Sequence, residues 1–70
     1  MMGDSQKIYV VYEVGEYGLD MDIKYAGASW EKADSYKPSR TWRVVIQTWA
    51  QGRLIHSEHR PRIKEEHHGR

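Results

Sequence analysis

The side chains that could support chemistry in this 70-residue chain are histidines, acids and serines, because the sequence contains no cysteine. His56 and His59 are three residues apart, and positions three apart in a strand point to opposite faces. A structural zinc site needs about four converging ligands, usually with cysteine among them. We therefore expect no metal site, and we expect these histidines, together with His67 and His68, to be solvated.

Other patterns that could mark an active or binding site lack the required spacing. Glu16, Asp20 and Asp22 have neither the spacing nor the central glycine of a calcium loop. The glycines of Gly15-x-x-Gly18 are too close together for a phosphate-binding loop, and no helix is expected directly after them. None of the five serines lies in a nucleophile-elbow context. The sequence thus predicts no catalytic residue, no cofactor and no enzymatic activity.

The segment over residues 41–49 is the strand around which the other elements are expected to assemble. Trp42, Val44 and Ile46 point to one face of this strand, and Val45 and Trp49 point to the other. A strand with one solvated face alternates cleanly between apolar and polar residues. The pattern therefore indicates a strand that is at least partly covered on both faces.

The remaining elements follow from periodicity and from capping and turn residues. Residues 7–14 and 21–25 predict an antiparallel hairpin. Ser29 predicts the N-cap of a helix of about two turns that ends before Pro38. Gln51-Gly52 predicts a two-residue turn into a fourth strand. This ββαββ order predicts an α+β domain with a four-stranded antiparallel sheet and one short helix on one face.

Chain length and composition predict one small domain that needs a partner. We expect a domain over residues 7–57, a flexible N-terminus over 1–6 and a disordered charged tail over 58–70. A chain of this size buries only about 60% of its unfolded surface, so oligomerisation would complete its core. The absence of cysteine fits a reducing cytoplasm, and the chain shows no targeting or membrane-spanning segment.

The turn at Gln51-Gly52 divides the apolar residues between the two faces of the sheet. The side beneath the helix is expected to hold the core residues Ile8, Val10, Tyr12, Ile23, Trp30, Ala33, Trp42, Val44, Ile46 and Ile55. The far side is expected to present the interface candidates Tyr9, Val11, Arg43, Val45, Trp49, Arg53 and Leu54. A patch of this kind reaches several hundred Å², which is typical of interaction surfaces.

Charge is distributed unevenly along the chain. Residues 1–36 carry a net charge of −4, and residues 37–57 carry +4 with no acid. Such a division favours contact with another copy or with an anionic partner. Alternatively, the two halves neutralise each other within one fold.

Two segments, Ile8-Tyr9-Val10-Val11-Tyr12-Glu13 and Gly27-Ala28-Ser29-Trp30-Glu31-Lys32-Ala33, resemble parts of small phage-encoded and prophage-encoded accessory proteins. Those proteins begin with a similar strand, continue with a Ser-x-Glu-Lys-Ala helix and close with a hairpin containing tryptophan, as Trp42 does here. The resemblance covers about residues 7–57 and implies a ββαββ accessory protein. It defines no catalytic residue.

Three functional hypotheses follow. The first is a non-catalytic phage accessory or regulatory protein in the host cytoplasm that self-associates and binds a host or phage protein through the far side of its sheet. The second is a module in which Tyr9 and Trp49 stack bases of single-stranded nucleic acid while Arg43 and Arg53 bind its phosphates. The third, implied by the resemblance, is an anti-defence protein that sequesters a nucleotide signal. No membrane partner is expected.

Overall fold

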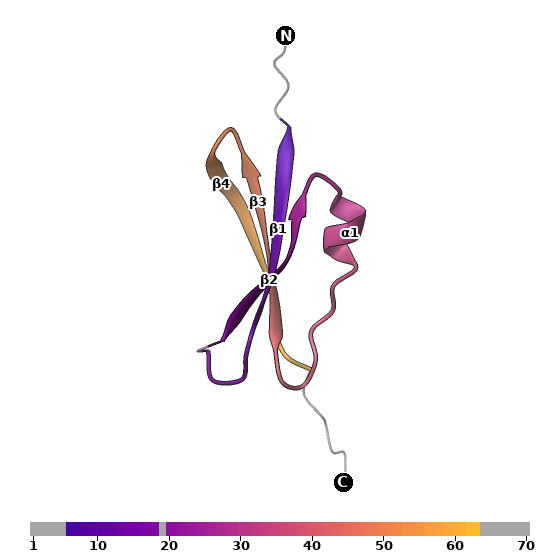
Figure 1. The fold of residues 1–70 in the computed structure, drawn as a ribbon, viewed down its shortest axis with the longest axis vertical. Helices are drawn as coiled ribbons and strands as arrows, with labels where there is room; N and C mark the ends of the chain where they lie inside the picture. The colour runs from indigo at the N-terminus through magenta and orange to yellow at the C-terminus, as the bar shows by residue number, and fades with distance from the viewer. Residues whose placement is uncertain (1–5, 19, 64–70) are drawn as a thin grey trace, which may run out of the picture.

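The computed structural model describes residues 6–18 and 20–63, which form one antiparallel sheet and one short helix. The strands are β1 (Lys7–Val14), β2 (Met21–Gly27), β3 (Arg43–Ala50) and β4 (Arg53–Arg60), and helix α1 (Trp30–Asp34) lies between β2 and β3 in the chain. The strand order in the sheet is β2-β1-β3-β4. The predicted α+β class and ββαββ order are confirmed (Figure 1).

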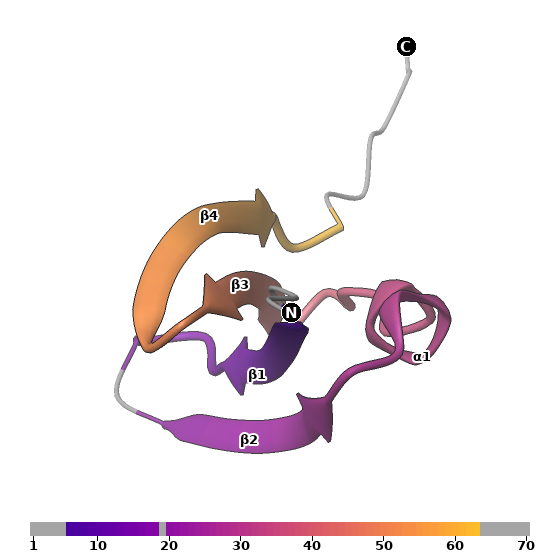
Figure 2. The same ribbon diagram turned by 90° about the horizontal axis from the view of Figure 1, so that it is seen from above.

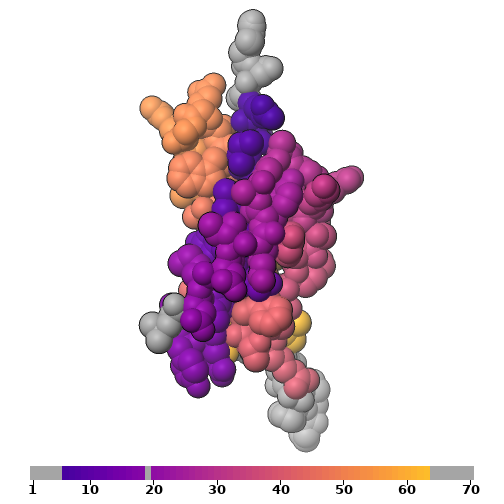
Figure 3. All heavy atoms as spheres, viewed as in Figure 1, coloured from indigo at the N-terminus to yellow at the C-terminus, as the bar shows by residue number. Residues whose placement is uncertain are grey.

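The sheet is strongly twisted and is covered by α1 on one side. Viewed from above, the four strands follow one another across the molecule, with α1 beside the end of β2 (Figure 2). In the space-filling view the atoms of α1 lie to the right of the strands, and the upper left outline is formed by the β3–β4 hairpin itself (Figure 3). Within the described residues, the face opposite α1 is covered by no helix.

The β3–β4 hairpin contains the predicted turn and keeps the regular register of a two-residue hairpin as far as Trp49 and Leu54. Gln51 and Gly52 both have positive φ, 55° and 75°, as a type I′ turn requires. Beyond Trp49 and Leu54 the register shifts, so that Thr48 lies opposite His56 and Ile55 is an extra residue in a bulge. The prediction that Ile55 lies in the core is wrong, because the bulge leaves this side chain 52% exposed.

Strand β4 is longer than expected, and this changes the boundary of the domain. It continues to Arg60, three residues beyond the predicted end at 57, because β3 offers pairing partners as far as Val44. The chain beyond β4 is also tied to the domain, since the Ile63 amide donates a hydrogen bond to the Ser39 carbonyl at 2.9 Å. The rest of the two predicted flexible ends, residues 1–5 and 64–70, lies outside the described residues.

Helix α1 begins as predicted and ends early. Ser29 is the N-cap, and its hydroxyl accepts a hydrogen bond from the Lys32 amide at 3.2 Å. The helix ends at Asp34 rather than near Pro38, because the Ser35 hydroxyl and amide both donate to the Lys32 carbonyl in a tightened last turn. With five residues, α1 contributes a single fully buried side chain, Ala33.

The core lies between α1 and the sheet. Its fully buried members are Val11, Ala33, Val44 and Ile46, and Tyr9, Tyr25, Tyr36 and Trp42 pack around them. The predicted positions of Trp42, Val44, Ile46 and Ala33 on the helix side are thus confirmed. The ring of Trp30 meets that of Tyr9 edge to face, 5.4 Å between centroids, although Trp30 is still partly exposed.

The two faces of strand β1 are reversed relative to the prediction. Tyr9 and Val11 lie beneath α1, because Val11 pairs directly with Ile46. Ile8, Val10 and Tyr12 therefore lie on the far face, as does Ile23, which pairs with Tyr12 after a bulge in β2. The predicted far-side positions of Tyr9 and Val11 and the predicted core positions of the other four residues are wrong.

The small size of α1 explains why tyrosine side chains lie on the helix side of the sheet. A single short turn leaves gaps around the core, and tyrosines fill them while their hydroxyls reach the backbone of the surrounding loops. Tyr25 Oη accepts a hydrogen bond from the Ser29 amide at 3.0 Å, and Tyr36 Oη donates to the Lys24 carbonyl at 3.1 Å. Gly27 permits the first contact, because a Cβ at this position would lie 2.6 Å from Tyr25 Oη.

Replacing Tyr25 by Phe is expected to destabilise the start of α1. The substitution removes the acceptor for the Ser29 amide, which is worth about 1 kcal/mol in free energy of unfolding. Urea denaturation followed by circular dichroism measures this change. Tyr17→Phe is the matched control, since the Tyr17 side chain is largely exposed in the β1–β2 connection. Equal stability of wild type and Tyr25→Phe would contradict the assigned role.

Candidate functional site

The sheet face opposite α1 presents apolar side chains from all four strands, and we call it the helix-free face. Strand pairing assigns ten apolar residues to it: Ile8, Val10, Tyr12, Val14, Met21, Ile23, Ala26, Val45, Trp49 and Leu54. Ile8, Met21, Ile23 and Leu54 are exposed, Ile23 at 70%. Contiguous apolar surface of this kind on a small protein usually marks an interaction site.

Trp49 lies on the helix-free face near the β3–β4 turn. It lies between Ile8 on β1 and Leu54 on β4, its direct pairing partners. Its indole Nε1 donates a hydrogen bond to Gln47 Oε1 at 3.2 Å, so the ring is directed along β3. This contact satisfies the polar edge of the indole within the protein and leaves its apolar surface for packing.

The helix-free face is almost free of charge. The ionisable residues that strand pairing assigns to it are Arg43 at one end of β3 and His59 opposite Val45 on β4. The carboxylates of the sheet lie elsewhere: Glu13 pairs with Val44 and forms an ion pair with Lys24 at 3.6 Å, and Glu58 pairs with Ile46. The face thus combines apolar side chains with a positive residue at one end.

The structure divides the seven predicted interface residues. Arg43, Trp49 and Leu54 lie on the helix-free face with accessible side chains. Val45 is on this face but only 1% exposed, because Tyr12 and His59 flank it on the neighbouring strands. Tyr9 and Val11 are on the helix side, and Arg53 lies opposite Ala50 at the hairpin end, on the helix side of the register.

The same division separates the residues predicted to bind nucleic acid. Trp49 and Arg43 share the helix-free face but lie at opposite ends of β3, whereas Tyr9 and Arg53 belong to the other face. The predicted set of two aromatic and two basic residues therefore does not converge on one surface. Binding of single-stranded nucleic acid stays a prediction.

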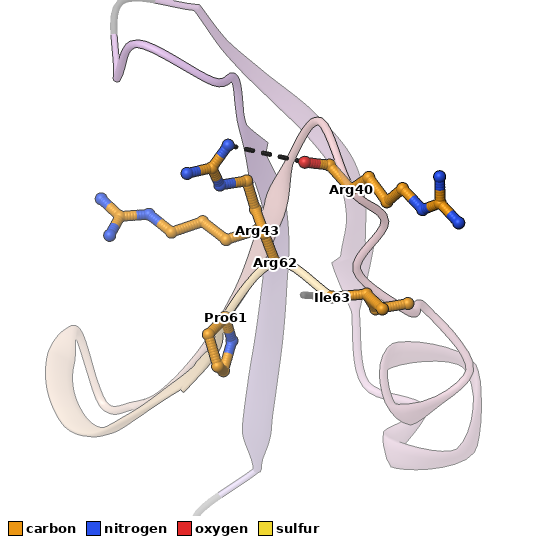
Figure 4. Close-up of a pocket in the computed structure, with 5 residues that line it drawn as sticks. All are labelled: Arg40, Arg43, Pro61, Arg62 and Ile63. Atoms are coloured by element: carbon orange, nitrogen blue, oxygen red, sulfur yellow. Dashed lines mark hydrogen bonds between the residues drawn. The ribbon is translucent and has the colours of Figure 1, made fainter. Parts of the chain in front are cut away.

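A second feature is a pocket of about 330 Å³ at the end of the sheet where β3 begins. Its lining residues, which define the arginine pocket, are Arg40, Arg43, Pro61, Arg62 and Ile63. The guanidinium groups of Arg43 and Arg62 extend to the same side, and that of Arg40 extends to the opposite side (Figure 4). Sequence reasoning identified Arg43 but missed Arg62, because Arg62 belongs to the segment predicted to be a disordered tail.

Arg60 is another residue that the sequence analysis missed, and it joins β4 to α1. Its guanidinium pairs with Asp34 Oδ1 and Glu58 Oε2, both at 2.6 Å, and donates to the carbonyl oxygens of Asp34 and Tyr36 at 3.0 and 3.2 Å. The hydrogen bond to Asp34 contributes most to raising the pKa of Arg60, against the opposing effect of partial burial. The contribution of the guanidinium charge is therefore present below the pKa of an unfolded-state arginine and is lost as the pH rises through the raised pKa of Arg60.

Residues 6–18 and 20–63 contain neither a metal-binding cluster nor a membrane-spanning helix. No group of three histidine, aspartate or glutamate side chains in this part of the chain is placed to hold a metal ion. In the same residues, no helix is long and apolar enough to cross a membrane. Comparisons with protein-family models, curated proteins and solved structures found no match to this chain.

Proposed function

We propose that this protein is a non-catalytic interaction protein that pairs with a second copy of itself through the helix-free face. The observation that supports this proposal is the exposure of Ile8, Ile23 and Leu54, large apolar side chains from three strands, on one continuous surface. Covering them would remove apolar area from water at about 25 cal/mol per Å². A second sheet packed on this face would cover the apolar side chains on the second face of β3, as the helix covers those on the first.

The size of the helix-free face fits a dimer interface. Its strands are seven or eight residues long. Four such strands about 4.8 Å apart, with a rise of about 3.3 Å per residue, cover about 500 Å². Two copies that pack over the whole face would then bury about 1,000 Å² together, near the lower limit for a specific protein interface.

The charge distribution also fits a symmetric pair. A two-fold axis that lies in the interface plane and crosses β3 at right angles would pass over uncharged residues near Val45 and Gln47. Each Arg43 would then lie over the Trp49 end of the other copy, where a cation can contact an aromatic ring. The two Arg43 side chains would be about 20 Å apart, beyond the screening length of about 8 Å at physiological salt, so they would not repel each other strongly.

We also propose that this dimer acts as a phage accessory or regulatory protein in the host cytoplasm, where the same face binds a host or phage protein. The phage assignment rests on the segments over residues 8–13 and 27–33, and the cytoplasmic location rests on the absence of cysteine. A partner protein that uses this face would compete with the second copy. The apparent affinity for the partner would therefore fall as the concentration of this protein, and with it the fraction of dimer, rises.

Light scattering coupled to size-exclusion chromatography tests self-association. For a chain of 8.3 kDa, wild type is expected to give a dimer mass, and Ile23→Glu is expected to raise the dimer dissociation constant at least tenfold. Because Ile23 is mostly exposed in the single chain, this variant is expected to fold normally. Tyr17→Glu, in the exposed β1–β2 connection, is the control and should remain dimeric. A wild-type monomer at all concentrations, or equal dissociation in both variants, would reject the proposal.

A further inference from the structure

We propose that the arginine pocket binds the phosphoryl group of a small organic phosphate. Arg43 and Arg62 are its basic side chains with guanidinium groups on the same side (Figure 4). A guanidinium presents a planar set of N–H donors that matches two phosphate oxygens at once. Two such groups directed to one side can hold a phosphate dianion from two directions.

The contacts that these arginines make within the protein leave most of their donors available. Arg62 Nη1 lies 3.5 Å from the Arg40 carbonyl oxygen and 4.0 Å from Glu16 Oε2, both at the outer limit of a polar contact. No carboxylate of the described residues pairs with Arg43. The two guanidinium groups thus carry two positive charges against the single carboxylate of Glu16, and an anionic ligand would offset the remaining positive charge.

The backbone of the pocket is held in place before any ligand binds. The Ile63 amide donates to the Ser39 carbonyl at 2.9 Å, and the Ser39 amide donates to the Trp42 carbonyl at 3.0 Å. The Ser39 hydroxyl also accepts from the amides of Thr41 and Trp42, at 3.1 and 3.3 Å. These bonds join the segment after β4 to the loop before β3, so the two walls of the pocket are fixed relative to each other. Such preorganisation lowers the entropic cost of binding.

The shape of the pocket indicates a ligand larger than phosphate itself. A volume of about 330 Å³ is at the lower end of the range for small-molecule sites. Pro61 supplies apolar surface on the side of Arg43 and Arg62, whereas the Ile63 side chain extends to the opposite side, as Arg40 does (Figure 4). The ligand is therefore a phosphate monoester whose organic part packs on Pro61, as in a mononucleotide.

Calorimetric titration of the full chain with adenosine monophosphate, inorganic phosphate and adenosine, at constant ionic strength, tests this proposal. Adenosine monophosphate is expected to bind at least tenfold more tightly than adenosine, and more tightly than inorganic phosphate. Arg43→Gln and Arg62→Gln are each expected to weaken its binding about tenfold. Arg53→Gln removes an equal charge at the opposite end of the sheet and should leave binding unchanged. Glu16→Gln removes the competing carboxylate and should strengthen binding about threefold.

Several results would overturn the proposal. These are equal binding of adenosine monophosphate and adenosine, and a loss of affinity in Arg53→Gln equal to that in Arg43→Gln and Arg62→Gln. Tight binding of inorganic phosphate alone would reject the organic part of the ligand. The Ile23→Glu variant separates this proposal from self-association, because the monomeric variant, whose Arg43 contacts no second copy, should bind adenosine monophosphate at least as tightly as the wild type.

Discussion

Replacing Ile46 by Ala is expected to lower the free energy of unfolding by about 3 kcal/mol. Ile46 is 0% exposed and packs with Val11 and Ala33 in the small core beneath α1. Truncation of a buried isoleucine removes its transfer free energy and leaves a cavity, and the rigid sheet on both sides of β3 limits collapse into that cavity. Total stabilities of small domains begin near 5 kcal/mol, so this loss is a large part of the whole. Chemical denaturation of both proteins measures it.

Ile55→Ala is the matched control, because it is the same substitution in the neighbouring strand. The bulge at this position leaves Ile55 half exposed, so the expected loss is less than about 1 kcal/mol. A regular two-residue hairpin would instead place Ile55 in the core beside Ile46, and the two variants would then be similarly destabilised. Similar losses would therefore contradict the bulged register.

This comparison shows where sequence reasoning about the fold was sufficient. Alternation in β3, the N-cap at Ser29 and the turn at Gln51-Gly52 each have one strong physical interpretation, and all three occur as predicted. A bulge has no comparable signal, because it depends on the strand twist that the whole sheet adopts. One extra residue reverses every later side chain in β4, so His56 and Glu58 lie on the helix side.

Strand β1 shows a different limit. Its two faces, Ile8-Val10-Tyr12 and Tyr9-Val11, are both apolar, so periodicity alone cannot decide which face meets the helix. The short helix decides it, because Tyr9 can meet Trp30 while Val11 packs on Ala33. Of the predicted interface residues, Arg43 and Trp49 are on the predicted face because the alternation in β3 is regular. Leu54 is on the same face because it pairs with Trp49 before the bulge.

Replacing Arg60 by Ala is expected to lower the free energy of unfolding by about 2 kcal/mol. The side chain is 18% exposed and makes four charge-assisted contacts, of which the three to Asp34 and Tyr36 join β4 to the end of α1 and the residues after it. Hydrogen bonds to charged groups are worth about 1.5–3 kcal/mol when partly buried, and the exposed half of the Asp34 carboxylate reduces this value. For a domain of this size, the melting temperature should fall by about 8–16 °C. Thermal denaturation followed by circular dichroism measures the shift.

The control for this prediction is Arg53→Ala, at the first position of the same strand. Arg53 is exposed beside the turn and makes no ion pair with the described residues, so its melting temperature should stay within about 2 °C of wild type. Arg60→Lys distinguishes charge from geometry. A lysine keeps the positive charge but cannot reach Asp34, Glu58 and two carbonyl oxygens at once, so this variant should recover less than half of the loss. Full recovery by lysine would show that charge alone holds β4 against the helix.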